Sequence, residues 1–278
     1  MEEALDGVQV VSRPAQRVLQ ERIDGGLRSL ALFERSRLVR QVTDLLLRGI
    51  QVEPIPPWLG PGHRAILVSN YPSVSSSLLA VMKLVCRFPD KQPRLKAIAR
   101  REVVTQATPL LKALGVDRFV FPAQKDESGV YRLETRVFKQ VLAYLNHPGH
   151  ILWLSMTGRT RGNGLLESDL RTGAAQFALK KGVPLVPMGL VTKGQGSKLR
   201  VVKVRFGEPI TSPLAGGIDE VERTDLLIDL TKVAMCQIAR LLPAEQRGDF
   251  ADADEKLCEA TARLEACRAG QSTIEIPA

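Results

Sequence analysis

The chain has few of the residues on which several common kinds of site depend. Its four cysteines form no C-x-x-C pair, its three histidines do not stand at metal-ligand spacing from them, and aromatic residues make up only 5% of the 278 positions. The cysteine pattern argues against a disulfide framework or a metal site, and no motif assigns a bound cofactor. The shortage of aromatic residues argues against a protein that stacks single-stranded nucleic acid. We therefore expect free thiols at Cys86, Cys236, Cys258 and Cys267.

Long apolar runs are missing as well. Residues Ser77–Cys86 are interrupted by Lys83, and Gly182–Val191 is short, so neither run reaches the roughly 20 residues that a membrane-spanning helix needs. The beginning of the chain, Met1–Asp6, is acidic and lacks the cationic start and apolar core of a secretory signal. The sequence therefore predicts a cytoplasmic protein with no spanning segment, and peripheral association with a membrane stays open.

The positive charge of the chain is confined to its middle. The net charge of +9 divides into +1 for residues 1–50, +6 for 51–122, +8 for 123–217 and −6 for 218–278. A basic centre predicts an anionic partner, such as a phosphate head group, a phosphorylated cofactor or an acidic carrier protein. Nucleic acid is the weaker candidate, because the basic residues are not interleaved with aromatic side chains.

The first 50 residues predict an N-terminal pair of helices. Residues 13–24 and 27–48 are separated by two glycines, and the second stretch carries an apolar residue every three to four positions. This stripe either docks on the core or lies on a membrane surface, where neighbouring arginines would meet anionic lipid. Its members are Leu27, Leu30, Leu38, Val42 and Leu45.

The rest of the chain predicts an α/β domain followed by acidic helices. Residues 51–62 are rich in proline and are expected to be a linker, and residues 63–217 alternate short apolar runs with helical patterns. Such alternation is typical of a single, largely parallel sheet covered by helices. Residues 218–278 predict C-terminal acidic helices that pack on the domain or bind a protein partner. The expected strands are 65–69, 95–99, 119–121, 151–155, 185–191 and 200–206.

The most informative feature is the turn that follows the first of these strands. Residues Asn70–Ser76 read N-Y-P-S-V-S-S. With three later segments, this turn resembles the 1-acylglycerol-3-phosphate acyltransferase family, whose turn reads N-H-x-x-x-x-D. The resemblance implies the fold of that family across roughly residues 62–210. It also makes Tyr71 and Ser76 the candidate catalytic positions, where the family has histidine and aspartate, and Asn70 a candidate ligand-binding residue.

The second segment supplies a candidate phosphate ligand. Residues Leu114–Phe121 are similar to a family block whose arginine contacts the phosphate of the acceptor, and Arg118 matches that arginine. A guanidinium group suits phosphate because it can donate two parallel hydrogen bonds. Lys96, Arg100 and Arg101 precede this block and would add to the same positive field.

Two further segments complete the resemblance. Gly158, flanked by Arg159 and Arg161, lies where the family has a glycine turn, and this turn predicts an anion cradle. Residues Leu170–Pro187 are the closest match and mainly reflect architecture. Arg171 is the exception, because it stands at a predicted helix start where an anion is favoured.

The replacements at the family positions decide which function we favour. The family histidine, aspartate and glutamate are replaced by Tyr71, Ser76 and Thr157. Tyrosine has a reference pKa near 10 and is a poor base at neutral pH, whereas serine cannot supply the orienting charge. We therefore favour an acyltransferase-fold protein that binds acyl-CoA, acyl-carrier protein or phospholipid-type ligands at a membrane surface without the usual His-Asp catalysis.

The alternative is an active O-acyltransferase. It would move an acyl chain from acyl-CoA or acyl-carrier protein to a lysophospholipid or another hydroxyl acceptor. Its base would be Tyr71 or one of His63, His147 and His150, and Arg118 and Arg159 would assist. A serine nucleophile paired with a histidine is less favoured, because the chain has no G-x-S-x-G elbow and serines after a strand are usually helix caps.

Overall fold

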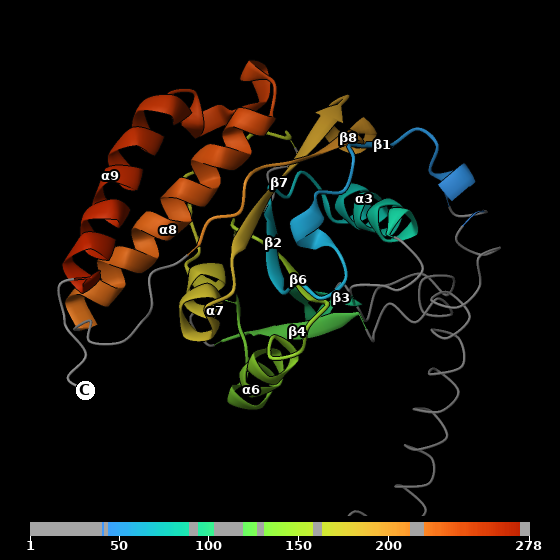
Figure 1. Cartoon of the computed structure of the whole chain (residues 1–278). Coiled ribbons are helices and arrows are strands. Elements are labelled where there is room, and N and C mark those ends of the chain that lie inside the picture. The colour runs from blue at the N-terminus through green and yellow to red at the C-terminus, as the bar shows by residue number, and fades with distance from the viewer. Residues whose placement is uncertain are drawn as a thin grey trace, which may run out of the picture.

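The computed structural model describes residues 41, 44–88, 94–102, 119–126, 131–157, 163–211 and 220–272. Strands and helices alternate through these residues, which confirms the α/β class (Figure 1). The strands are β1 (Gln51–Val52), β2 (Ala65–Ser69), β3 (Arg94–Arg100), β4 (Val120–Lys125), β5 (Tyr131–Arg132), β6 (His150–Ser155), β7 (Leu185–Lys193) and β8 (Arg200–Phe206). The α-helices are α3 (Val74–Arg87), α6 (Thr135–Tyr144), α7 (Gly173–Lys181), α8 (Glu220–Leu241) and α9 (Ala253–Ser272). The 3₁₀ turns are η1 (Pro57–Leu59), η3 (Gly196–Lys198), η4 (Ala244–Gln246) and η5 (Gly248–Phe250).

The strands form one mixed sheet in the order β1-β8-β7-β2-β6-β3-β4-β5. Strand β2 pairs in parallel with β6 and β7, β3 pairs in parallel with β6 and β4, and β1 pairs in parallel with β8. The pairs β7–β8 and β4–β5 are antiparallel. Residues 194–199, which join β7 to β8, are too few for a crossover, so this connection can only be a hairpin.

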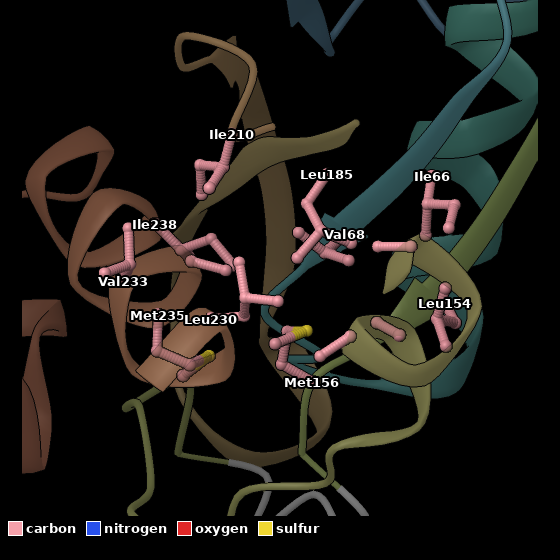
Figure 2. Close-up of a cluster of buried hydrophobic side chains, with 14 of the residues drawn as sticks. Ile66, Val68, Leu154, Met156, Leu185, Ile210, Leu230, Val233, Met235 and Ile238 are labelled. Carbon is pink, nitrogen blue, oxygen red and sulfur yellow. The ribbon is translucent and has the colours of Figure 1, made fainter. Parts of the chain in front are cut away.

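The central strands are buried on both faces, and their alternating side chains divide the core in two. In β2, Ile66 and Val68 face a cluster that includes α6, α7, α8 and α9, whereas Leu67 faces a cluster that includes α3 and η1. Figure 2 shows part of the first cluster, to which β2 contributes Ile66 and Val68 and α8 contributes residues such as Leu230. Helix α3 therefore covers one face of the sheet, and α6, α7, α8 and α9 cover the opposite face.

The direction of the connections reverses between β2 and β6. Helix α3 carries the chain from β2 past β6 to β3, whereas α7 carries it from β6 back past β2 to β7. Because crossovers in parallel sheets are right-handed, opposite directions place these two helices on opposite faces. In open α/β sheets, ligands bind outside the carboxyl ends of the strands at such a reversal. This topology fixes where a site can form.

The C-terminal residues form the helices α8 and α9, as predicted for 218–278, and α8 is part of the main core. Residues Leu226, Leu230 and Val233 of α8 are buried against the sheet. A side chain at Gly189 of β7 would lie 2.6 Å from Cβ of Leu241, so glycine allows this helix to approach the strand closely. The prediction that these helices pack on the domain agrees with this contact.

The N-terminal residues are described only in part. The predicted helices of residues 13–24 and most of 27–48 lie outside the described residues. Residues 51–62, which the prolines predicted to be a linker, lie against the sheet: β1 pairs with β8, and Leu59 is fully buried. Proline suits the first position of η1, because a backbone N–H group at this position would have no helical partner and proline lacks that group.

A buried ion pair attaches the segment before β1 to α3. The side chain of Lys83 is only 2% exposed, although it belongs to an otherwise apolar part of α3. Its Nζ atom donates to the backbone oxygen of Asp44 (2.7 Å) and lies 2.8 Å from Asp44 Oδ1, which Arg87 Nε also approaches at 3.1 Å. Asp44 therefore balances a charge that is otherwise surrounded by the core.

Removing Asp44 should destabilise the fold more than removing both partners. We expect Asp44→Ala to lower the free energy of unfolding by about 3 kcal/mol, because Lys83 would keep a buried charge without a counterion. The double variant Asp44→Ala/Lys83→Met should recover most of this loss, since methionine has a similar shape and no charge. Urea denaturation of the single and double variants measures the coupling. Additive effects of the two substitutions would contradict the ion pair.

Candidate functional site

The turn after β2 is held by the side chain of Asn70. This residue is 3% exposed; its Nδ2 atom donates to the backbone oxygen of Leu190 (3.0 Å), and its Oδ1 atom accepts from the Leu190 N–H group (2.7 Å). The amide thus continues the pairing of β2 with β7 after the backbone of β2 has left the sheet. The predicted ligand-binding role of Asn70 finds no support in this geometry, because its side chain is directed to β7 and not to the pocket described below.

The serines of the turn begin helix α3. Ser73 is the N-cap, and its hydroxyl oxygen accepts from the N–H group of Ser76 (3.3 Å). The hydroxyl group of Ser76, which is nearly buried, forms a hydrogen bond with that of Ser73. Ser69 is fully buried and accepts from Trp153 Nε1 (2.9 Å). Ser76, a candidate catalytic position in the sequence, therefore lies in the first turn of a helix.

All three histidines of the chain lie at the amino ends of the parallel strands, whereas the turn after β2 lies at their carboxyl ends. His150 begins β6 and Ser155 ends it, a separation of about 16 Å at the usual rise of a strand. The backbone oxygen of His63 accepts from Gly149 N (3.1 Å), so His63 lies beside the start of β6, and the His147 ring is 5.2 Å from that of His150. The prediction that a histidine could act as base beside Tyr71 is therefore wrong, as is the serine–histidine reading.

A pocket of about 690 Å³ lies at the carboxyl ends of β2, β3 and β6, beside the reversal of the connections. Its volume is within the range of small-molecule sites. Both aliphatic or aromatic side chains and polar groups line it. The apolar lining includes Ile98, Leu133, Phe138, Leu154 and Phe177. The polar lining includes Tyr71, Arg100, Tyr131, Arg132, Ser155, Thr157, Arg171, Thr172 and Gln176.

Three arginines line this pocket, and no acidic residue is among the described lining residues. The Arg100 guanidinium lies 4.6 Å from the centre of the Tyr131 ring. Arg132 pairs with Asp126 (2.8 Å), and Arg171 lies 3.2 Å from a carboxylate of the neighbouring loop. These two pairs are exposed, so their strength is modest and an anionic ligand can compete with the carboxylates. The pocket therefore favours a negatively charged group.

Helix α7 begins at the pocket and adds to its positive potential. Gly173 and the N-cap Thr172 line the pocket, and the Thr172 side chain makes no capping hydrogen bond. The N–H groups of a first helical turn have no acceptor within the helix, and the helix dipole is positive at this end. Arg171 is held beside this turn, because its backbone N–H group donates to the backbone oxygen of Met156 (2.9 Å). The prediction placed Arg171 at a helix start, and the structure has it there.

Tyr71, a predicted site residue, lines the pocket. Burial raises its pKa above the ordinary value of 10.0, and the positive charge of Arg100 opposes this effect only in part. The phenol is therefore protonated at neutral pH, and the fraction present as phenolate, the form that could accept a proton, is smaller than for a free tyrosine. Its position suits a hydrogen-bond donor better than a proton acceptor.

No family model, curated protein or solved structure matches the chain. The acyltransferase resemblance accordingly stays a prediction that rests on the four sequence segments. No helix of the described chain is long and apolar enough to cross a membrane. Within the same residues, no group of three or more His, Cys, Asp or Glu side chains could hold a metal ion.

Several predicted site residues cannot be placed. Arg118, Gly158, Arg159 and Arg161 lie outside the described residues. Lys96, expected to add to the positive field, instead lies with its ammonium group 4.9 Å from the centre of the Phe121 ring and does not line the pocket.

Other lining residues were missed by the sequence analysis. Arg132 lies in the short strand β5 and Phe138 lies in α6, and only the topology brings them to the pocket. Arg100, which the sequence predicted to add to the positive field, does line the pocket, because it ends a strand whose carboxyl end lies there.

Asn70→Ala should destabilise the protein by about 2–3 kcal/mol, because it leaves the buried N–H and oxygen of Leu190 without partners. Chemical denaturation measures this loss. The control is Asn146→Ala, since Asn146 is exposed and binds only Lys181 among the described contacts. We expect the control to change stability by less than about 0.5 kcal/mol. Equal effects of the two substitutions would contradict the structural role of Asn70.

The raised pKa of Tyr71 predicts a loss of stability at alkaline pH. The unfolded chain releases this proton near pH 10.0, whereas the folded chain keeps it to higher pH, so the stabilisation present below pH 10.0 declines above it. Tyr71→Phe removes this contribution. Urea unfolding from about pH 9 to about pH 11 should then show a shallower decline for the variant. A tyrosinate signal from Tyr71 at or below pH 10.0 in ultraviolet difference spectra would refute the expected shift.

Proposed function

We propose that this protein binds an anionic amphiphile, in which a phosphate-bearing group is attached to an acyl chain, and that it does so at a membrane surface. The observation that supports the proposal most is the composition of the pocket. Three arginines and the start of α7 line it together with apolar side chains of β3, β6, α6 and α7, and no acid is among the described lining residues. Acyl-CoA, acyl-carrier protein and lysophospholipid all carry this combination of groups.

The polar part of the pocket suits a phosphate group. Arg100, Arg132 and Arg171 can each donate two hydrogen bonds to neighbouring oxygens, and charge-assisted bonds of this kind are stronger than neutral ones. The N–H groups at the start of α7 favour the same charge. Tyr71, which is protonated at neutral pH, adds a hydroxyl donor.

The apolar part suits a hydrocarbon chain. Phe138 and Phe177 stack with their ring centres 5.0 Å apart, and they connect α6 to α7 beside the sheet. Ile98, Leu133 and Leu154 extend this surface without a charged group. Burial of each methylene group is worth about 0.8 kcal/mol, so a chain of several carbons would contribute most of the affinity.

We further propose that the protein does not transfer the acyl chain by the usual His-Asp route. Histidine is missing from the pocket, Ser76 begins a helix, and burial raises the pKa of Tyr71. Tyr71 would therefore contribute little of the roughly 10²–10⁴-fold rate increase that proton transfer to a positioned base normally supplies. These observations favour binding over the alternative of an active O-acyltransferase.

Titration with a short-chain lysophosphatidate, kept below its micelle concentration, tests the proposal. We expect a 1:1 complex, and the matched neutral monoacylglycerol should bind about tenfold more weakly because it lacks the charge that the arginines recognise. Arg171→Gln should weaken binding of the lysophosphatidate about tenfold. The control is Arg136→Gln, since Arg136 is exposed on α6 and does not line this pocket. Equal binding of the charged and neutral lipids, or no saturable binding, would overturn the proposal.

A further inference from the structure

Helix α3 is apolar on the side that faces away from the sheet. Its sheet side carries Ala80, Val81 and Leu84, as expected for a core helix. Its outer side nevertheless exposes Val74 (41%) and Leu79 (40%), while the charged Lys83 is buried. A helix that is apolar all round is normally covered on every side, and exposed apolar patches mark interaction surfaces.

Two leucines at the end of the preceding segment extend this surface. Leu45 is 64% exposed and Leu46 is 77% exposed, more than any other large hydrophobic residue among those described. The ion pair of Asp44 with Lys83 and Arg87 holds them beside the C-terminal half of α3. We define this set of side chains as the α3 surface; its members are Leu45, Leu46, Val74 and Leu79.

The charges around the α3 surface are positive. Within residues 44–50 and 74–88 the only acidic residue is Asp44, and two cations already contact its carboxylate. Arg48 is exposed one turn from Leu45, and Arg87 is 54% exposed at the end of α3. Protruding aliphatic side chains with arginines beside them match the boundary of an anionic bilayer, where apolar groups enter the acyl region and arginines meet head groups.

A second copy of the chain fits this surface less well. An isologous interface brings the same residues of both copies together. It would bring Arg48 and Arg87 of both copies into one interface in a chain of net charge +9, and like charges at an interface are unfavourable. The surface also adjoins the pocket, because Val74 follows Tyr71 by three residues and Tyr71 lines the pocket.

We infer that the α3 surface docks the protein on an anionic lipid bilayer, with Leu45 and Leu46 inserted at the head-group boundary. The inference rests on the membrane association included in the proposed function and names the residues that provide it. It places the start of α3, and with it the Tyr71 side of the pocket, next to the lipid surface.

Vesicle co-sedimentation of the full chain tests the inference. Vesicles of phosphatidylcholine with phosphatidylglycerol should bind the wild-type chain more strongly than phosphatidylcholine alone. Leu45→Ser/Leu46→Ser should reduce binding by about tenfold or more, because two exposed leucines lose their contact with the acyl region. Arg48→Gln should reduce binding to the anionic vesicles by about fivefold. The matched control is Ile228→Ser, a 38%-exposed residue of α8 on the other side of the sheet, which should leave binding unchanged.

Unchanged binding of the double leucine variant, or an equal loss in the Ile228 control, would overturn the inference. So would a wild-type dimer that the leucine substitutions dissociate without any vesicle binding, since the surface would then join two copies. The lysophosphatidate titration without vesicles separates this result from the proposed function. If the leucine variant keeps its lysophosphatidate affinity and loses vesicle binding, the α3 surface alone has been removed, as the inference requires.

Discussion

Two hydrogen bonds between the Asn70 side chain and the Leu190 backbone are the constraint on which the site depends. They allow the buried strand β2 to end while its neighbour β7 continues, without leaving polar backbone groups of β7 unpaired in the core. The chain can therefore turn at Tyr71 and begin α3 at Ser73. This turn lies where the connections of the sheet reverse, and it forms one side of the pocket.

The same topology separates the chemical groups of the chain. Parallel pairing of β2, β6 and β3 collects Tyr71, Arg100 and the start of α7 at one edge of the sheet, and it leaves the histidines at the other edge. A pocket with cationic and apolar parts but without an imidazole base is suited to hold an amphiphile more than to activate a hydroxyl group. The charges of the site therefore support the proposal of recognition over catalysis.

The sequence was sufficient to predict the fold class and most strands, because short apolar runs bounded by turns are compatible with few structures other than buried strands. Residues 200–206 agree with β8 at both ends, and 151–155 agree with β6 to within one residue. The site was predictable only where a residue ends a strand or begins a helix, as Arg171 does. The contact of Asn70 with Leu190 could not be predicted because a motif does not reveal the direction of a side chain, and Phe138 was missed because only tertiary packing brings α6 to the pocket.

Mass spectrometry of the purified protein after incubation with lysophosphatidate and long-chain acyl-CoA tests the central claim most directly. The account predicts a lipid retained by the protein in a 1:1 complex, with no more diacylated product than a heat-inactivated control gives. Formation of diacylated product by the native protein would contradict the claim that the pocket binds without transfer. Absence of any retained lipid would contradict the claim that the pocket recognises an anionic amphiphile.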